Sequence, residues 1–254
     1  MLRSLMCGAA CVAVLGISIA SAAETGTLKG RFVYKGKAPE PAKIRVDRDA
    51  EVFGKLGLVD ESLLVDKDGG IANVVLYVSD KNVKVDPSMK DKVPEKLIYD
   101  NKDGRFAPHV STIWLDHQTL VLSNSDPVGH NSNLQPIADA GINPLLAPGS
   151  KVEYKFMRQQ TVPQKVGCNI HPWMQGYILP RNNPYAAVSA EDGTFVIEGL
   201  PAGELEFRAW HEVPGYLEAK TDWKKGKFTY TIKAGENDLG DIEVPASVFA
   251  AKKK

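Results

Sequence analysis

The chain has 254 residues, of which 43% are hydrophobic and 24% are charged, a balance typical of a globular protein with one large or two modest domains. Its 31 basic and 31 acidic residues give a formal net charge of zero. Because there is no net positive field and no long basic run inside the chain, we do not expect binding of nucleic acid or of an anionic membrane surface.

The first 23 residues have the pattern of a secretory signal peptide. Arg3 provides the positive start, residues 5–20 form an apolar run, and small residues follow it as a cleavage site. The run is too short to span a bilayer comfortably, and no second such run follows. We therefore expect export to the periplasm or the extracellular space and a mature chain without a transmembrane span. A lipoprotein anchor at Cys7 or Cys11 and an uncleaved signal anchor are the alternatives.

The mature chain shows short alternating or β-branched runs and almost no helical periodicity. Turn-forming residues separate these runs, and the chain contains 22 Gly and 16 Pro. The pattern predicts an all-β chain of sandwich type, with a short helix or irregular insertion over Val52–Leu64. In chain order, the predicted strands are Thr27–Tyr34, Ala72–Val78, Val110–Leu115, Thr119–Leu122, Val152–Phe156, Thr194–Ile197, Glu204–Trp210 and Lys227–Ile232.

Four segments are expected after the leader, with a boundary near Asn182-Asn183-Pro184. Residues 96–184 are predicted to form the first β-sandwich. Residues 24–95 are predicted to complete its sheets, with a separate small β domain as the alternative. Residues 185–245 are predicted to form a second, small β-sandwich, and residues 246–254 a C-terminal tail.

The stretch from Tyr185 to Val244 resembles the carboxypeptidase-regulatory-like module, a small β-sandwich of a carbohydrate-binding-like fold group. The resemblance rests on turns and core residues at strand-and-turn spacing, including Asp192-Gly193, Leu200-Pro201-Ala202-Gly203 and Glu206–Trp210. It implies a structural or attachment role, and no chemistry is assigned to this segment.

One segment of the mature chain combines residue types that bind soft metals. Cys168, the only cysteine left after removal of the leader, is followed by His171 and Met174 at intervals of three residues. An isolated thiol is a liability in an oxidising compartment. On a loop leaving a strand, this spacing lets the three side chains converge. A thiolate, two imidazoles and a weak axial thioether are the donor set of blue copper sites.

The second imidazole is expected from His130. It lies in a polar loop, residues 123–131, directly after the predicted strand Thr119–Leu122. This loop and the downstream Cys168 loop are expected to meet at one end of the sandwich.

The two segments together resemble the cupredoxin family, in which an upstream His, often followed by Asn, joins a C-terminal Cys…His…Met loop. The short Cys-x-x-His-Pro-x-Met loop is most similar to that of amicyanin-type members. The resemblance implies a Greek-key β-sandwich that binds one copper ion, cycling between Cu(I) and Cu(II), through His130, Cys168, His171 and Met174.

The resemblance also implies roles for neighbouring residues. Asn131 is expected to tie the two ligand loops together by hydrogen bonds. The edge of His171 is expected to lie near solvent as the electron port, within an apolar docking patch that includes Pro172 and Trp173.

Other metal sites fit the sequence less well. Covalent haem attachment needs Cys-x-x-Cys-His, which is absent, and Met is a poor ligand for zinc. We expect His109, His117 and His211 to be structural or surface residues. The segment Trp210-His211-Glu212 is expected to pack near the copper domain or to shape a docking face.

The sequence therefore predicts a secreted type 1 copper protein that carries single electrons between partner proteins and is not an enzyme, because four ligands leave no open position for a substrate. The first alternative is a copper-binding protein for storage, delivery or sensing. The second is an extracellular β-sandwich with a carbohydrate-binding or structural role, whose glycan contacts would come from the aromatic residues Trp210, Tyr216, Trp223, Phe228 and Tyr230.

Overall fold

The computed structural model describes residues 24–250, so the predicted signal peptide lies outside the described residues. The prediction of an all-β chain is confirmed. Helical elements within the described residues are short, and none of them is long and apolar enough to cross a membrane. They are α1 (Ala50–Phe53), α2 (Met89–Lys92), a 3-10 turn (Lys224–Gly226) and α3 (Ala246–Phe249).

The middle sandwich consists of two four-stranded sheets built from residues 96–181. Its buried faces contribute the cluster around Tyr99, Leu122, Val166 and Ile178, and this cluster includes Cys168 and Met174. One sheet has the order β10-β6-β3-β4, formed by Lys151–Tyr154, Thr119–Asn124, Lys96–Lys102 and Arg105–Ala107. The other has the order β5-β12-β11-β8, formed by Val110–Trp114, Gln175–Arg181, Gln164–Gly167 and Asn133–Leu134. A separate pair, β7 and β9, is formed by His130–Asn131 and Leu145–Leu146.

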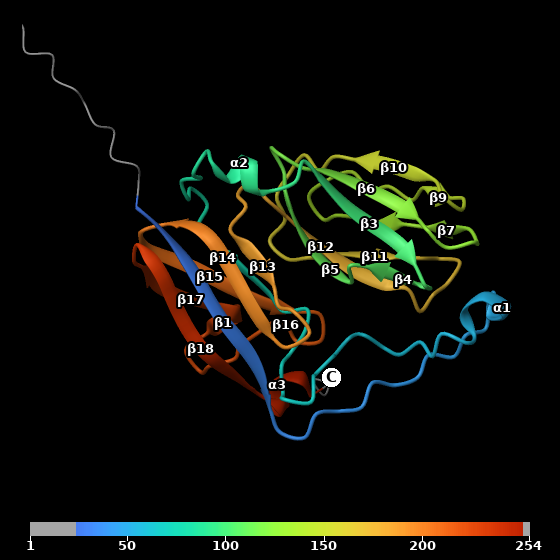
Figure 1. Cartoon of the computed structure of the whole chain (residues 1–254), viewed down its shortest axis with the longest axis horizontal. Coiled ribbons are helices and arrows are strands. Elements are labelled where there is room, and N and C mark those ends of the chain that lie inside the picture. Colours follow the sequence, from blue (N-terminus) through green and yellow to red (C-terminus); the bar gives the residue numbers. More distant parts are fainter. Residues whose placement is uncertain (1–23, 251–254) are drawn as a thin grey trace, which may run out of the picture.

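The outer sandwich contains the C-terminal strands and also the first two strands of the chain (Figure 1). One sheet has the order β14-β1-β18, formed by Thr194–Pro201, Thr25–Lys35 and Gly235–Pro245. The other has the order β13-β2-β15-β16 with β17 also on β15, formed by Ala186–Val188, Val75–Val78, Gly203–His211, Gly215–Tyr216 and Lys227–Ile232.

This pairing differs from the expectation that residues 24–95 complete the sheets of the copper domain. β1 pairs antiparallel with β14 and parallel with β18, and β2 pairs with β13 and β15. Leu28 and Phe32 of β1 are fully buried in the core of the outer sandwich. Alternation along a strand indicates which face is apolar but not which strand is its neighbour, so the sequence did not distinguish the two sandwiches.

The C-terminal end also differs from the expected tail. The short helix α3 packs onto the outer sandwich, where the Phe249 ring lies 5.5 Å from that of Tyr34 and edge-on to that of His211 at 5.2 Å. The chain therefore stays packed through residue 249. Of the aromatic residues named for the glycan-binding alternative, Trp210 and Trp223 are buried.

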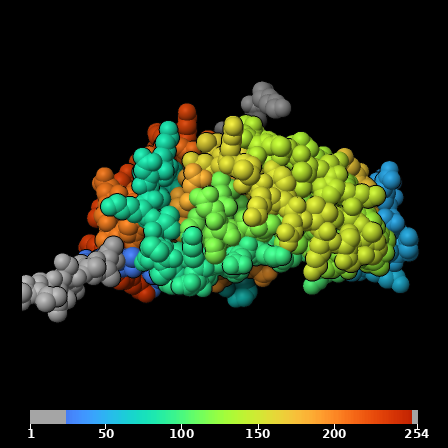
Figure 2. Space-filling model, turned by 90° about the horizontal axis from the view of Figure 1, so that it is seen from above, coloured from blue at the N-terminus to red at the C-terminus, as the bar shows by residue number. Residues whose placement is uncertain are grey.

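Between β1 and β2 lies a long irregular segment, residues 37–65, which we call the arm. It leaves the outer sandwich and reaches the far end of the middle sandwich, where α1 lies (Figure 1). Viewed from above, it appears in blue at the end of the molecule opposite the outer sandwich (Figure 2). A short helix and irregular chain were expected over Val52–Leu64, and the structure has α1 from Ala50 to Phe53 followed by irregular chain.

The two sandwiches are joined by a small buried cluster. Val75, Tyr77 and Trp210 of the outer sandwich pack with Val110 and Leu179 of the middle sandwich.

A buried polar contact lies beside this cluster, where Glu212 Oε1 is 3.2 Å from His109 Nε2. The segment Trp210-His211-Glu212 was expected either to pack near the middle sandwich or to shape a docking face. Its contact with His109 agrees with the first of these two roles.

We predict that Phe32→Ala lowers the free energy of unfolding by about 3–5 kcal/mol, because it empties a fully buried aromatic position in β1. Val196→Ala, at a position 53% exposed on the paired strand β14, is the control and should change stability little. Chemical denaturation followed by fluorescence measures both. An unchanged unfolding midpoint for Phe32→Ala would show that β1 is not part of the folded core.

Candidate metal centre

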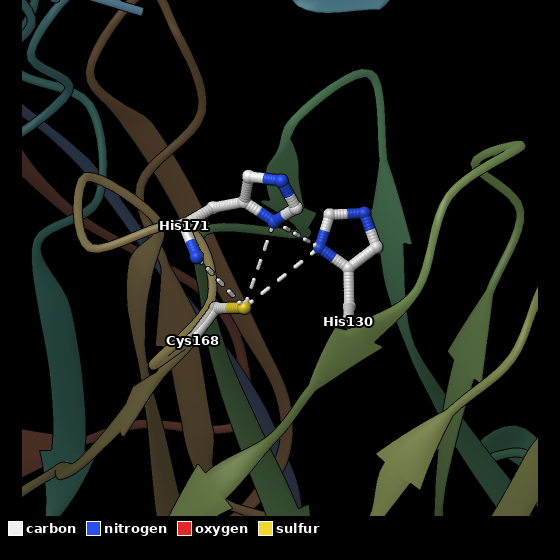
Figure 3. A group of neighbouring side chains, drawn as sticks. All are labelled: His130, Cys168 and His171. Carbon is white, nitrogen blue, oxygen red and sulfur yellow. Dashed lines mark hydrogen bonds between the residues drawn. The ribbon is translucent and has the colours of Figure 1, made fainter. Parts of the chain in front are cut away.

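Cys168 and His171, three residues apart in sequence, meet the more distant His130 at one end of the middle sandwich (Figure 3). Cys168 Sγ lies 3.8 Å from His130 Nδ1 and 3.8 Å from His171 Nδ1, and the two Nδ1 atoms are 3.1 Å apart. Both histidines are fully buried and Cys168 is 4% exposed. Among the described residues, this is the one group of three or more His, Cys, Asp or Glu side chains close enough to hold a metal ion.

The Cys168 loop is shaped by the hairpin of β11 and β12. These strands pair antiparallel as far as Gly167 and Gln175. The backbone N–H of Cys168 then donates to the carbonyl of Met174 at 3.1 Å, and the N–H of Met174 donates to the carbonyl of His171 at 2.9 Å. The loop is thus closed at its base and turned at its tip, which brings the His171 ring back over the sulfur.

His130 is held by the loop that precedes it and by its strand partner. β7 pairs with β9, with His130 opposite Leu146. The side-chain amide of Asn124 donates to the carbonyls of Val128 (2.8 Å) and Leu146 (2.9 Å), which braces both strands of this pair.

Asn131 connects the two ligand loops. Its Oδ1 accepts from the backbone N–H groups of Asn169 at 2.8 Å and Ile170 at 3.3 Å, and its Nδ2 donates to Asn143 Oδ1 at 2.6 Å. Asn131 was expected to tie the two ligand loops together by hydrogen bonds. The hydrogen bonds observed connect the strand of His130 to the residues that follow Cys168.

Each imidazole has a carboxylate at its outer nitrogen. His130 Nε2 lies 3.0 Å from Asp126 Oδ2, and His171 Nε2 lies 2.7 Å from Asp49 Oδ2. A carboxylate there holds the proton of a neutral imidazole on Nε2, so that Nδ1 is the nitrogen that can bind a metal ion. Neither carboxylate was predicted from the sequence, where the only available signal was the spacing of four residues between Asp126 and His130.

The surroundings ionise two of the three groups in the metal-free protein. Burial opposes the charge on His130, but its hydrogen bond to the Asp126 carboxylate and the adjacent Cys168 raise its pKa to about 9. Burial likewise opposes the thiolate, but the interaction with His130 and the backbone N–H groups at Asn131 and His171 lower the pKa of Cys168 to about 6. Near neutral pH the pair is therefore a thiolate beside an imidazolium.

Met174 lies in the buried cluster that contains Cys168 and is 2% exposed. Its backbone is hydrogen-bonded to that of Cys168, so the residue borders the same end of the sandwich. The axial role of its sulfur stays a prediction.

The edge of His171 is not near solvent, which corrects the expectation of an exposed electron port. The ring is fully buried, with Phe53 edge-on at 5.2 Å and Trp173 at 5.1 Å between ring centroids. Trp173 is half-buried and donates its Nε1–H to the carbonyl of Gly104 at 3.1 Å, while Pro172 is exposed. The sequence did not reveal this covering because Phe53, which covers the ring together with Trp173, belongs to the arm.

The other three histidines lie apart from this cluster. His109 contacts Glu212 and Glu61, and His117 Nε2 lies 2.5 Å from the carbonyl of Val93. His211 is buried in the outer sandwich, where burial lowers its pKa to about 3.

The donor set fits a transition-metal ion bound in a trigonal arrangement. Bonds of about 2.0–2.1 Å to nitrogen and 2.3 Å to sulfur, at trigonal angles, separate the donors by about 3.5 to 3.8 Å. The observed separations of 3.1 to 3.8 Å are close to this range. One thiolate with two imidazoles suits copper chemistry.

Comparison with known proteins gives partial similarities of fold. The chain matches no protein-family model and no curated protein. Among solved structures it is similar to a novel purple cupredoxin from Nitrosopumilus maritimus, with 24% identity and a TM-score of 0.29 over 35% of this chain and 100% of that one.

Two further solved structures are similar to part of the chain. A copper-containing nitrite reductase from Thermus scotoductus has 19% identity and a TM-score of 0.31, over 39% of this chain and 27% of that one. Reduced amicyanin carrying the P94F mutation has 12% identity and a TM-score of 0.29, over 42% of this chain and 98% of that one.

We predict that the thiolate of the metal-free protein titrates with a midpoint near pH 6, because the His130 charge stabilises it. Asp126→Asn should raise this midpoint, since it removes the carboxylate that keeps His130 protonated. Ultraviolet absorption of the thiolate measures the midpoint, and Asp116→Asn provides a matched control outside the cluster. A midpoint at the ordinary value of about 8.5 in the parent protein would contradict the pairing.

Proposed function

We propose that the protein is an exported type 1 copper protein that carries single electrons. The observation that carries the proposal is the convergence of a buried sulfur and two buried Nδ1 atoms within 3.8 Å of one another. Copper supplies one-electron chemistry when it is bound by such donors. His130, Cys168 and His171 would hold the ion, and Met174 would be the fourth ligand.

The protein's own residues keep the donors in one arrangement. The Cys168–Met174 backbone bond and the Asn131 bridge hold both loops, so the donors need to move little when the charge of the bound ion changes. The backbone N–H of His171 lies 3.4 Å from the sulfur and donates to it, which stabilises the thiolate. Phe53 and Trp173 keep water away from the His171 side.

We propose a carrier and not an enzyme. The described donors are buried and the proposed axial ligand completes the set, which leaves no position for a substrate. The partners are proteins that give or accept one electron. The leader-like pattern of the first 23 residues supports export, and the lack of net charge gives no support to a nucleic-acid partner.

A second function, copper storage or delivery, is favoured by one observation. His171 is completely covered, so a partner protein does not reach the ring edge directly. A covered site suits retention of a metal ion better than rapid exchange of electrons.

The first test is a copper titration of the mature protein from Glu24 onward, followed by visible absorption. We expect an intense thiolate-to-Cu(II) band that bleaches reversibly on reduction. Cys168→Ser should abolish the band, and His130→Gln should weaken or shift it. His117→Gln, a histidine outside the cluster, is the matched control and should keep it. A band that survives Cys168→Ser would overturn the assignment.

Kinetics separate the two functions. We expect the Cu(I) protein to be oxidised rapidly by ferricyanide, with reversible colour development. Tight Cu(I) binding combined with slow oxidation would instead support storage or delivery.

A further inference from the structure

The two histidines depend on carboxylates of different origin. Asp126 lies four residues before His130 and also accepts from the backbone N–H groups of Asp103 at 2.6 Å and Gly104 at 3.0 Å. It is therefore part of the middle sandwich. Asp49 lies 122 residues before His171, belongs to the arm, and has a side chain that is 34% exposed. The orientation of His171 thus rests on a segment outside the sheets.

The arm also inserts an aromatic ring over the cluster. Phe53 is fully buried, with its ring 5.9 Å from that of His130 and 5.2 Å from that of His171. Gly104 makes room for the arm, because a Cβ at this position would lie 3.0 Å from Phe53 and 3.2 Å from Leu58. Asp49 and Phe53 together cover the side of His171 that faces away from the sulfur.

Near its tip the arm contacts the middle sandwich through side chains and forms no strand pairing with either sandwich. Its two halves bond to each other, with the N–H of Ile44 donating to the carbonyl of Leu58 at 2.9 Å. A cavity of about 270 Å³ lies between the arm and the loop that carries Trp173 and Met174. Near this cavity Glu61 lies 3.5 Å from Arg105.

An element held by side-chain contacts, without sheet hydrogen bonds, opens at lower free energy than the sheets beneath it. Separation of the arm would expose His171 without breaking the strand pairing of either sandwich.

We propose that the arm is a strap that retains the metal ion, with Asp49 as the positioning residue of His171 and Phe53 as the seal. Asp49 holds the ring so that Nδ1 stays directed at the bound ion. Phe53 excludes the water and competing ligands that would displace the ring. Metal enters and leaves when the strap lifts. The inference rests on the proposed function for the presence of a bound metal ion and for its identity as copper.

The test measures metal release from the full mature protein. Copper-loaded protein is mixed with an excess of a Cu(I) chelator of the bathocuproine type after reduction, or with EDTA in the oxidised state. We expect Asp49→Asn to release copper about 10-fold faster or more, as loss of an outer partner of a histidine ligand weakens metal binding by such factors. Phe53→Ala should also accelerate release. Asp49→Glu should restore part of the retention.

Glu51→Gln is the matched control, because Glu51 is an exposed carboxylate on the same short helix. Its release rate should equal that of the parent protein. Equal rates for Asp49→Asn and the parent would overturn the strap.

Two further readouts separate positioning from general destabilisation. The charge-transfer band and the Cu(II) electron paramagnetic resonance spectrum should shift in Asp49→Asn, while the unfolding midpoint of the metal-free protein stays near that of Glu51→Gln. A lowered midpoint with an unchanged spectrum would count against a positioning role.

The proposed function and the strap fail in different ways. Unchanged release from a blue, redox-active protein overturns the strap alone. Accelerated release of Co(II), used as a redox-inert probe of the same donors, from a protein that exchanges electrons slowly supports the strap and overturns the carrier. Failure of the parent protein to bind either metal overturns both.

Discussion

Burying a thiol and two imidazoles within 3.8 Å of one another is unfavourable unless their polar atoms have partners, and much of the structure at this end of the molecule meets that requirement. The backbone N–H of His171 donates a hydrogen bond to the sulfur. The carboxylates of Asp126 and Asp49 are hydrogen-bonded to the outer nitrogens of His130 and His171. The inner nitrogens and the sulfur are left facing one point. Because the outer ring nitrogens are hydrogen-bonded to carboxylates, the two Nδ1 atoms and the sulfur face one another.

The partners of the cluster come from three parts of the chain. The β11–β12 hairpin supplies the Cys168 loop, and the β6–β7 connection supplies His130 with Asp126. The arm supplies Asp49 and Phe53, and its starting point is set by the pairing of β1 with β14 and β18. The outer sandwich, although it provides none of the clustered donors, thus anchors the segment that closes the site.

The covering of His171 bears on how a partner protein would reach the proposed metal ion. An exposed histidine edge offers direct contact, whereas here His171 lies behind Asp49 and Phe53. In the proposed carrier, electrons would pass through the covering residues or from another side of the cluster. A groove of about 460 Å³ borders Cys168 and Met174, and no residue of the arm lines it.

The sequence alone determined the all-β class, the loop of Cys168, His171 and Met174, and the pairing of that loop with His130 and Asn131. The all-β class and the Cys168 loop depend on local alternation and on short spacings, which a single chain displays directly. The pairing with His130 and Asn131 was instead what the resemblance to the cupredoxin family implied. Tertiary structure decided the neighbours of β1 and β2, the covering of His171, and the role of Asp49. Alternation does not identify a strand's partner. The sequence around Asp49, which is irregular, also gives no sign that this residue contacts His171, 122 residues away. Such contacts exist only once the sheets have fixed where the arm begins and ends.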